Sequence, residues 1–169
     1  NGTSIKVDDK LVISSMPLNI LCDSVGLKCD LRFNSVILAY LVFEKDFVLP
    51  ENVQSLYFAH DTTYFHRVSE QKKFSSNNFP KNKTVLTFEI SYTNKQFIKE
   101  MSESELLKQV LDQFSSLGFV KKNSYISGFT RDCPHVNPIL EAGFENEFIR
   151  VNSFLSSLIN LHSVGGSAE

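Results

Sequence analysis

This sequence of 169 residues contains no tryptophan and only three cysteines, Cys22, Cys29 and Cys133. An odd number of cysteines at irregular spacing is not typical of a disulfide framework. Cys22 and Cys29 are also too far apart in sequence for a CxxC metal or redox pair. We therefore expect buried or idle thiols in a reducing compartment, which places the protein in the cytoplasm.

Long apolar runs and a strong charge are also missing. No run approaches the roughly 18 apolar residues that a membrane-spanning helix needs, so no transmembrane segment is expected. Residues 1–10 lack the basic flank and apolar stretch of a signal peptide. The formal net charge of −2 supplies no long-range field that would attract nucleic acid, which is therefore not an expected partner.

The common catalytic motifs are absent as well. There is no P-loop, GxGxxG, GxSxG or HExxH, so we expect no complete catalytic site and predict no catalytic residue. His60, Asp61 and His66 could form a metal cluster, but His and Asp are common in turns and we predict no metal site. Cys133 and His135 could pair a thiolate with an imidazole, although near neighbours in sequence rarely have the required geometry.

What the sequence does contain is a series of strands followed by helices. Leu86, Phe88, Ile90 and Tyr92 alternate with polar residues, which predicts a strand over 84–92 with one buried face. Ser102 and Glu105 have the spacing of a capping box, and Gly118 suits the end of the same helix. Further strands are predicted at 5–7, 11–14, 36–43, 54–59, 63–69, 125–131 and 161–164, with helices at 18–25 and 145–159.

This order predicts an α+β fold with a mostly antiparallel sheet of about five to six strands and two main helices. The first predicted strand begins almost at residue 1, and the last runs into the turn formed by Gly165 and Gly166. We interpret both as strands whose pairing neighbours lie elsewhere, and we expect the chain to be part of a larger protein.

Four segments carry a resemblance to a known family. They are VDDKLVISSMPL at 7–18, YFHRVS at 64–69 followed by Phe74, PILEAGFE at 138–145 and NLHSVGG at 160–166. In this order they resemble the later part of the flavin-dependent amine-oxidase superfamily, which includes protoporphyrinogen oxidase, phytoene desaturase and UDP-galactopyranose mutase. Gly166 stands where the family has arginine, and Leu140 where it has an aromatic residue.

The resemblance implies a substrate-binding domain at 19–159, flanked at 1–18 and 160–169 by pieces of a split FAD-binding domain. FAD would be bound by the parent protein, with no cofactor expected on this fragment and no activity from it alone. The implied partners are the N-terminal dinucleotide-binding part of the same protein and a small-molecule substrate. Cutting the flavin domain away would expose an apolar face, so we expect self-association of the fragment.

The same resemblance nominates individual residues. Arg67 is the first candidate for binding an anionic substrate group, because its guanidinium can contact a carboxylate or phosphate through two hydrogen bonds. The alternative is a surface arginine that pairs with Glu70 or Glu89. Tyr92 is a second candidate, for lining the substrate cavity. Gly165 and Gly166 would let the backbone approach the cofactor closely, or else form a plain turn.

Two other functions remain open at this point. A flavin-dependent sugar-nucleotide mutase would use the region around Arg67 for a phosphorylated substrate. A non-catalytic protein-interaction module would need neither flavin nor substrate, since a fold does not fix a function.

Overall fold

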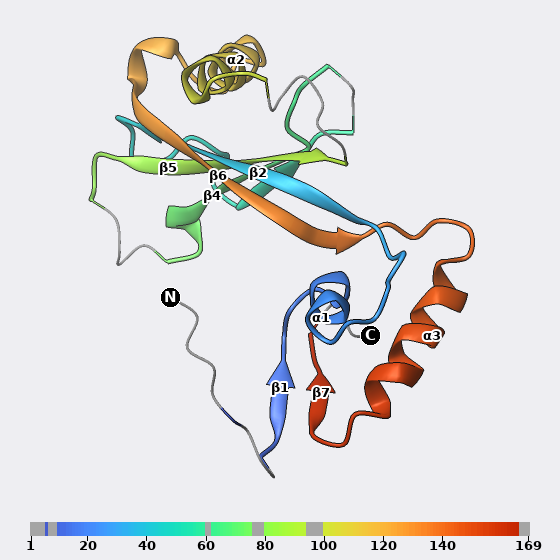
Figure 1. Cartoon of the computed structure of the whole chain (residues 1–169). Helices are drawn as coiled ribbons and strands as arrows, with labels where there is room; N and C mark the ends of the chain where they lie inside the picture. The colour runs from blue at the N-terminus through green and yellow to red at the C-terminus, as the bar shows by residue number, and fades with distance from the viewer. Residues whose placement is uncertain (1–5, 7–9, 60–61, 76–79, 94–99, 166–169) are drawn as a thin grey trace. The chain divides into compact units, whose positions relative to one another are not determined.

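The computed structural model describes residues 6, 10–59, 62–75, 80–93 and 100–165 of the chain (Figure 1). The backbone contacts divide the chain into two compact units. We call residues 35–134 the sheet unit, and residues 1–34 together with 135–169 the terminal unit. Within the described residues, no helix has both the length and the apolar character needed to cross a membrane.

The sheet unit is built on one antiparallel sheet of five strands, in the spatial order β3-β4-β5-β2-β6. The strands are β2 (Phe33–Phe43), β3 (Ser55–Tyr57), β4 (Arg67–Glu70), β5 (Thr84–Tyr92) and β6 (Tyr125–Pro138). The described residues also include two short 3-10 turns: η1 (Gln71–Lys73) follows β4, and η4 (Lys122–Ser124) precedes β6. The predicted α+β fold with a mostly antiparallel sheet is therefore confirmed.

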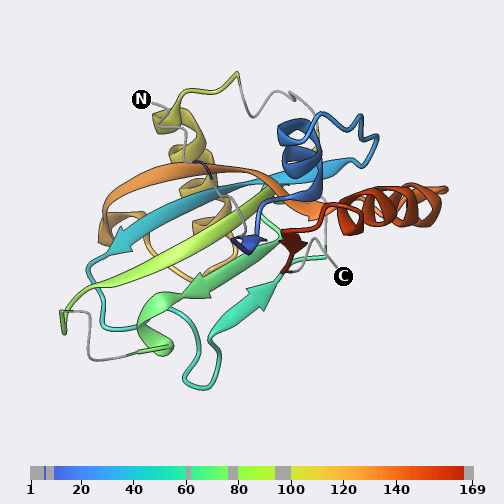
Figure 2. The ribbon, with the colours of Figure 1, turned by 60° about the horizontal axis from the view of Figure 1, so that its bottom comes forward.

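Helix α2 (Glu103–Ser116) covers one face of this sheet, as Figures 1 and 2 show. It begins with the predicted capping box, in which Ser102 and Glu105 each accept a hydrogen bond from the other's backbone. Its apolar stripe is buried against the sheet, where Phe88 of β5 lies with its ring centroid 5.0 Å from that of Phe114. Because this aromatic core occupies the α2 side of the sheet, the opposite face remains for other contacts.

Strand β6 is longer than the predicted 125–131. Pro134 and Pro138 would normally end a strand, because proline cannot donate a backbone hydrogen bond. β6 lies at the edge of the sheet, where one side of the strand needs no such donor. The strands predicted at 54–59 and 63–69 are shortened to β3 and β4, and the residues of the predicted turn, His60 and Asp61, lie outside the described residues.

Gly128 of β6 gives a first testable prediction. A Cβ at this position would lie 2.7 Å from the Tyr40 carbonyl oxygen and 3.2 Å from Leu107 Cδ2. Because the first contact is backbone, Gly128→Ala should lower the free energy of unfolding by about 1–3 kcal/mol. Chemical denaturation followed by circular dichroism measures the change. Ser127→Ala, at the exposed neighbour, is the control, and an equal stability of the two variants would contradict the packing described.

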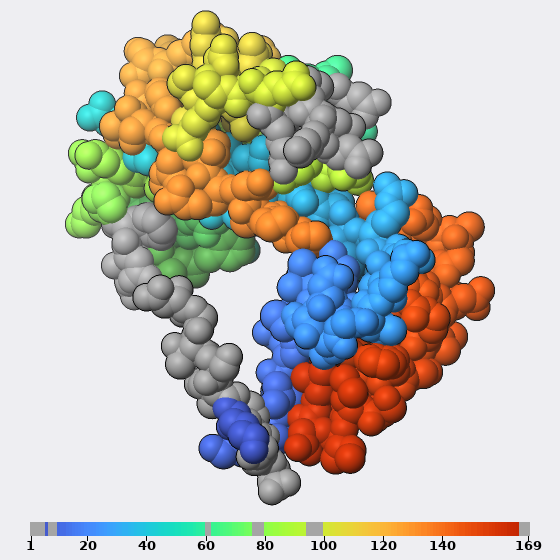
Figure 3. Space-filling model, in the orientation of Figure 1, coloured from blue at the N-terminus to red at the C-terminus, as the bar shows by residue number. Residues whose placement is uncertain are grey.

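The terminal unit contains the chain's second, smaller sheet. β1 (Val12–Ser14) pairs in parallel with β7 (Leu161–Ser163), the two meeting from distant parts of the sequence (Figure 3). Helices α1 (Leu18–Ser24) and α3 (Phe144–Ser156) belong to the same unit. Its core is a cluster of buried side chains: Leu18, Leu21, Cys22, Leu31, Val151 and Leu155. The strand predicted at 5–7 falls largely outside the described residues.

The predicted limits 1–18, 19–159 and 160–169 concern how the chain divides within a larger protein, and they stay a prediction. Within the chain itself, contacts group α1 and α3 with the β1–β7 pair rather than with the five-strand sheet.

Candidate ligand-binding face

The sheet face opposite α2 carries a polar cross-strand arrangement, which we call the polar face. Val68, Phe88 and Ala39 belong to the core, so the residues on either side of them in each strand point to the opposite face. The register places two rows there: Tyr57, Arg67, Glu89 and Leu38, and next to it Ser55, Ser69, Thr87 and Tyr40. Side chains from four strands thus gather on one surface.

Arg67 lies at the centre of the polar face. Its Nε donates to Glu89 Oε1 at 2.7 Å, its Nη2 donates to the same oxygen, and its Nη1 donates to the Tyr57 hydroxyl at 3.2 Å. The hydrogen bond to Glu89 is the main reason that the pKa of Arg67 is raised above its ordinary value. Arg67 is therefore held as a cation, and its side chain keeps 38% of its exposure.

The sequence left Glu70 and Glu89 as possible partners of Arg67, and in the structure Arg67 pairs with Glu89. Glu70 is buried elsewhere, where it accepts hydrogen bonds from the backbone of Val48 and Leu49. His66 approaches the other oxygen of Glu89, with Nε2 3.7 Å from Oε2. The ion pair does not remove Arg67 from the surface, because the guanidinium remains partly accessible.

A cavity of about 430 Å³ opens beside Arg67. Its lining residues are Ser55, Tyr57, Arg67, Ser69, Gln71, Phe74 and Glu89. The hydroxyls of Ser55 and Ser69 lie 2.8 Å apart, and Gln71 Nε2 donates to Thr87 Oγ1 at 2.9 Å. A guanidinium, a phenol, hydroxyls and a carboxylate together can bind a ligand that carries an anionic group and hydroxyl groups.

A second arginine lies on the same face, on β6. The Phe129 ring stacks on Tyr40 with centroids 4.7 Å apart, and the Arg131 guanidinium lies 5.0 Å from the Phe129 centroid. Because Tyr40 belongs to the polar face, Phe129 and Arg131 extend that face to the edge of the sheet. An aromatic surface flanked by cations suits a planar or anionic ligand.

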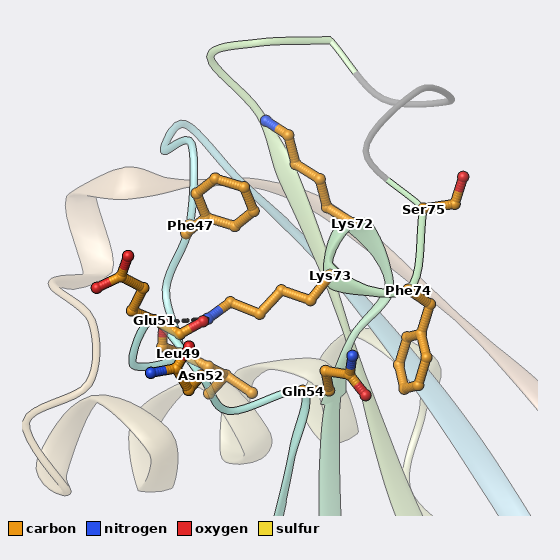
Figure 4. A pocket seen from close by; sticks show the side chains of 9 residues that line it. All are labelled: Phe47, Leu49, Glu51, Asn52, Gln54, Lys72, Lys73, Phe74 and Ser75. Atoms are coloured by element: carbon orange, nitrogen blue, oxygen red, sulfur yellow. Dashed lines mark hydrogen bonds between the residues drawn. The ribbon is translucent and has the colours of Figure 1, made fainter.

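A larger cavity, of about 840 Å³, adjoins the first through the shared residue Phe74 (Figure 4). Two lysines line it, but their ammonium groups are already occupied. Lys73 donates to the carbonyls of Leu49, Pro50 and Glu51, and Lys72 is bound in the same way by three carbonyls and by Asp46. An ammonium has three hydrogens to donate, so these lysines brace the surrounding loops instead of forming an anion site.

The predicted site residues are not brought together. Tyr92 belongs to the core on the α2 side, is 6% exposed, and donates its hydroxyl hydrogen to Asp132. It therefore lies on the face of the sheet opposite Arg67. Gly165 follows β7 in the terminal unit, with a φ of 102°, and Gly166 lies outside the described residues. The roles proposed for these residues stay predictions.

No group of three or more metal-ligating side chains exists within the ranges that the structure describes. His135, which we considered and did not favour as a partner of Cys133, accepts a hydrogen bond at Nδ1 from Asn19 Nδ2 at 2.8 Å. Sequence reasoning missed Tyr57 and the serine pair. Alternation marks their faces, but only the strand register shows that they lie next to Arg67.

Comparison with known proteins supports the fold. No family model matches the sequence, and no curated protein matches it. Among solved structures, reduced UDP-galactopyranose mutase is similar over 94% of this chain and 36% of its own, with a TM-score of 0.76 and 18% identity. A protein assigned as a protoporphyrinogen oxidase from Exiguobacterium sp. 255-15 is similar over 93% of this chain and 36% of its own, with a TM-score of 0.66 and 14% identity.

The chain thus spans about a third of the length of either structure. Both proteins are of enzyme types included in the superfamily that the four sequence segments resemble. At these identities the likeness concerns the fold, and at that level the resemblance is confirmed. The chain is a domain with the fold of part of the oxidase and mutase flavoproteins.

Proposed function

We propose that this chain is the substrate-domain part of an FAD-dependent flavoprotein of the oxidoreductase type and is inactive alone. The observation that carries this proposal is the fold likeness, which extends over 94% of the chain and corresponds to 36% of a reduced UDP-galactopyranose mutase. The four ordered segments support it independently, since their resemblance is a property of the sequence alone.

The β1–β7 pair supports a partner domain. Parallel strands occur almost only in larger sheets that are covered on both faces, and a pair of three-residue strands is too small to be stable by itself. Leu11, which precedes β1, and Ile13, which belongs to it, are 62% and 63% exposed. We propose that the dinucleotide-binding part of the same protein extends this sheet and covers these side chains. The same exposed side chains would drive self-association of the isolated chain.

Gly165 is the described residue proposed to approach the flavin. Apart from its chain neighbours, no atom of the described residues would lie within 4 Å of a Cβ built there, so the described part of the chain leaves space beside its backbone for a ligand. When bound, FAD would supply the electron-transfer chemistry. The chain's own contribution would be to bind and orient the substrate.

On the polar face, Arg67 would bind an anionic group of the substrate. Glu89 and Tyr57 hold its guanidinium in a fixed orientation, which reduces the conformational entropy lost on binding. Tyr92 was proposed to line the substrate cavity. It could contact a substrate only through its hydroxyl, together with Asp132, or after a change in the packing around its ring.

A second candidate function is a flavin-dependent sugar-nucleotide mutase. The likeness to UDP-galactopyranose mutase has a TM-score of 0.76, and the cavity beside Arg67 combines a cation with hydroxyl and amide groups. Phosphate oxygens would bind Arg67, and sugar hydroxyls would bind the serine and glutamine side chains.

The test uses the protein with its full coding sequence. We expect it to be yellow, with flavin absorbance near 450 nm, and a panel of amines, a porphyrinogen and a UDP-sugar then separates oxidase from mutase activity. A colourless protein without a flavin-binding segment would overturn the proposal and leave the non-catalytic interaction module.

The role of Arg67 has its own prediction. Hydrogen bonds to charged groups contribute about 1.5–3 kcal/mol, so Arg67→Gln should weaken binding of an anionic substrate or UDP-sugar by roughly 10- to 100-fold. Titration calorimetry measures this affinity. Arg32→Gln, at an exposed arginine paired with Glu141 in the terminal unit, is the matched control. Equal affinities of the two variants would show that the polar face is not the anion site.

A further inference from the structure

The end of α1 folds back on itself and brings two cysteines together. Val25 ends the helix, Gly26 takes a φ of 74°, and the Leu27 backbone N–H donates to the Cys22 carbonyl at 2.9 Å. The positive φ reverses the chain, which glycine does at little cost. Cys29, seven residues along the sequence from Cys22, follows this reversal and packs against the apolar cluster that contains Cys22.

The two thiols share one apolar cluster but differ in access. Cys22 is fully buried in the core of the terminal unit, and Cys29 is half-buried and packs against the same cluster. Among the neighbouring groups, Cys29 has the strongest influence on the pKa of the Cys22 thiol. Burial, and then the proximity of Cys29, raise the pKa of the Cys22 thiol to about 12, so Cys22 remains protonated at neutral pH.

We propose that Cys22 and Cys29 form a reversible intramolecular disulfide, and that Cys29 is the residue that first meets the oxidant. Sequence spacing argued against such a pair, because CxxC motifs bring thiols together within a single turn. Here the return of the chain after Gly26 supplies the proximity instead. A disulfide needs the two Cα atoms within about 7 Å, which a tight reversal of this kind can provide.

With a low-molecular-weight disulfide such as oxidised glutathione, the reaction has two exchange steps. The Cys29 thiolate attacks one glutathione sulfur, forms a mixed disulfide and releases one glutathione thiol. The Cys22 sulfur, on losing its proton, then attacks the Cys29 sulfur and releases the second glutathione thiol. The two protein thiols are oxidised, the oxidant is reduced to two thiols, and the two protons pass to the released glutathione.

Such a disulfide would act as a redox-sensitive clamp within the terminal unit. It would join the last turn of α1 covalently to the segment that enters β2. The next residue, Asp30, donates its backbone N–H to Glu147 Oε1 of α3 at 2.8 Å. The cross-link would therefore hold α1 to a segment that is itself bound to α3.

The test is oxidation of the reduced, folded full chain with oxidised glutathione, followed by thiol titration under denaturing conditions. Titratable thiols should fall from three to one, and peptide mapping should find Cys22 linked to Cys29. Cys133→Ser is the control and should form the same cross-link. Cys22→Ser should stop at a glutathione adduct on Cys29.

Three thiols that remain titratable, or a stable glutathione adduct on Cys29 in the unaltered chain, would overturn the proposal. Both results come from the natural sequence, so they hold even if Cys22→Ser fails to fold. A cross-link that includes Cys133 would overturn it equally.

Discussion

Replacing Glu70 with alanine should lower the free energy of unfolding by about 3–5 kcal/mol, because breaking a buried charge network leaves its partners unpaired. Glu70 is 0% exposed. Its carboxylate accepts hydrogen bonds from the backbone N–H groups of Val48 and Leu49 at 2.8 and 2.9 Å, and from the Thr84 hydroxyl at 2.8 Å. Lys73 Nζ lies 4.0 Å away. Alanine would remove all of these acceptor oxygens at once.

Urea denaturation followed by far-ultraviolet circular dichroism measures this loss, since the chain has no tryptophan to report by fluorescence. Glu70→Gln keeps the shape and one acceptor oxygen, so its loss should be smaller than that of the alanine variant. Glu44→Ala, at an exposed glutamate, should change stability by less than about 0.5 kcal/mol. If Glu70→Ala behaved like Glu44→Ala, the network would not be a stabilising feature.

The effect should reach the ligand-binding face as well. Glu70 is the last residue of β4, and Arg67 is the first. Loss of the contacts that tie β4 to the loop at Val48 and Leu49 would loosen the strand that presents Arg67. We therefore expect a ligand of the polar face to bind more weakly to Glu70→Ala, although Glu70 itself does not line the cavity beside Arg67.

Phe88→Ala should be destabilising to a similar degree, about 3–5 kcal/mol, the usual range for a buried phenylalanine. Phe88 is fully buried, and its ring packs against those of Phe65 and Phe114, with both centroid distances 5.0 Å. The cavity left behind would separate α2 from the sheet, because Phe114 belongs to the helix and Phe65 to the segment that precedes β4.

Thermal and urea unfolding of Phe88→Ala and Phe88→Leu provide the measurement. Leucine fills part of the volume, so its loss should be clearly smaller. Phe74→Ala, at an exposed phenylalanine, removes the same side chain from the surface and should cost under about 1 kcal/mol. Equal losses at Phe74 and Phe88 would contradict the position of the aromatic core.

Local patterns predicted individual elements closely. The alternation around Phe88 gave a strand at 84–92, and β5 has those bounds. The capping box at Ser102 and Glu105 marked the beginning of α2, and Gly118, with a φ of 85°, lies just beyond its end as predicted. These signals act within a few residues, so the chain carries them before any tertiary contact forms.

The candidate site could be predicted only in part. Arg67 was identified because an arginine next to a polar loop can bind an anion, and it lies on a cavity. Glu89 could be named only as one of two possible partners, and Tyr57 could not be identified at all, because both residues reach Arg67 through the register of three strands. Tyr92 was placed on the substrate side by resemblance, whereas the alternation of its own strand puts it in the core.

By itself, then, the sequence determined the class of fold, the alternating pattern of β5, the capping residues of α2 and a resemblance carried by four segments. Only the tertiary structure decided which segments meet: β1 with β7 in parallel, Arg67 with Glu89 and Tyr57, and Cys22 and Cys29 at one apolar cluster. The physical reason is one of range. Hydrophobic period and capping depend on neighbours within a turn or two of chain, whereas strand register and side-chain pairing depend on how distant surfaces pack together.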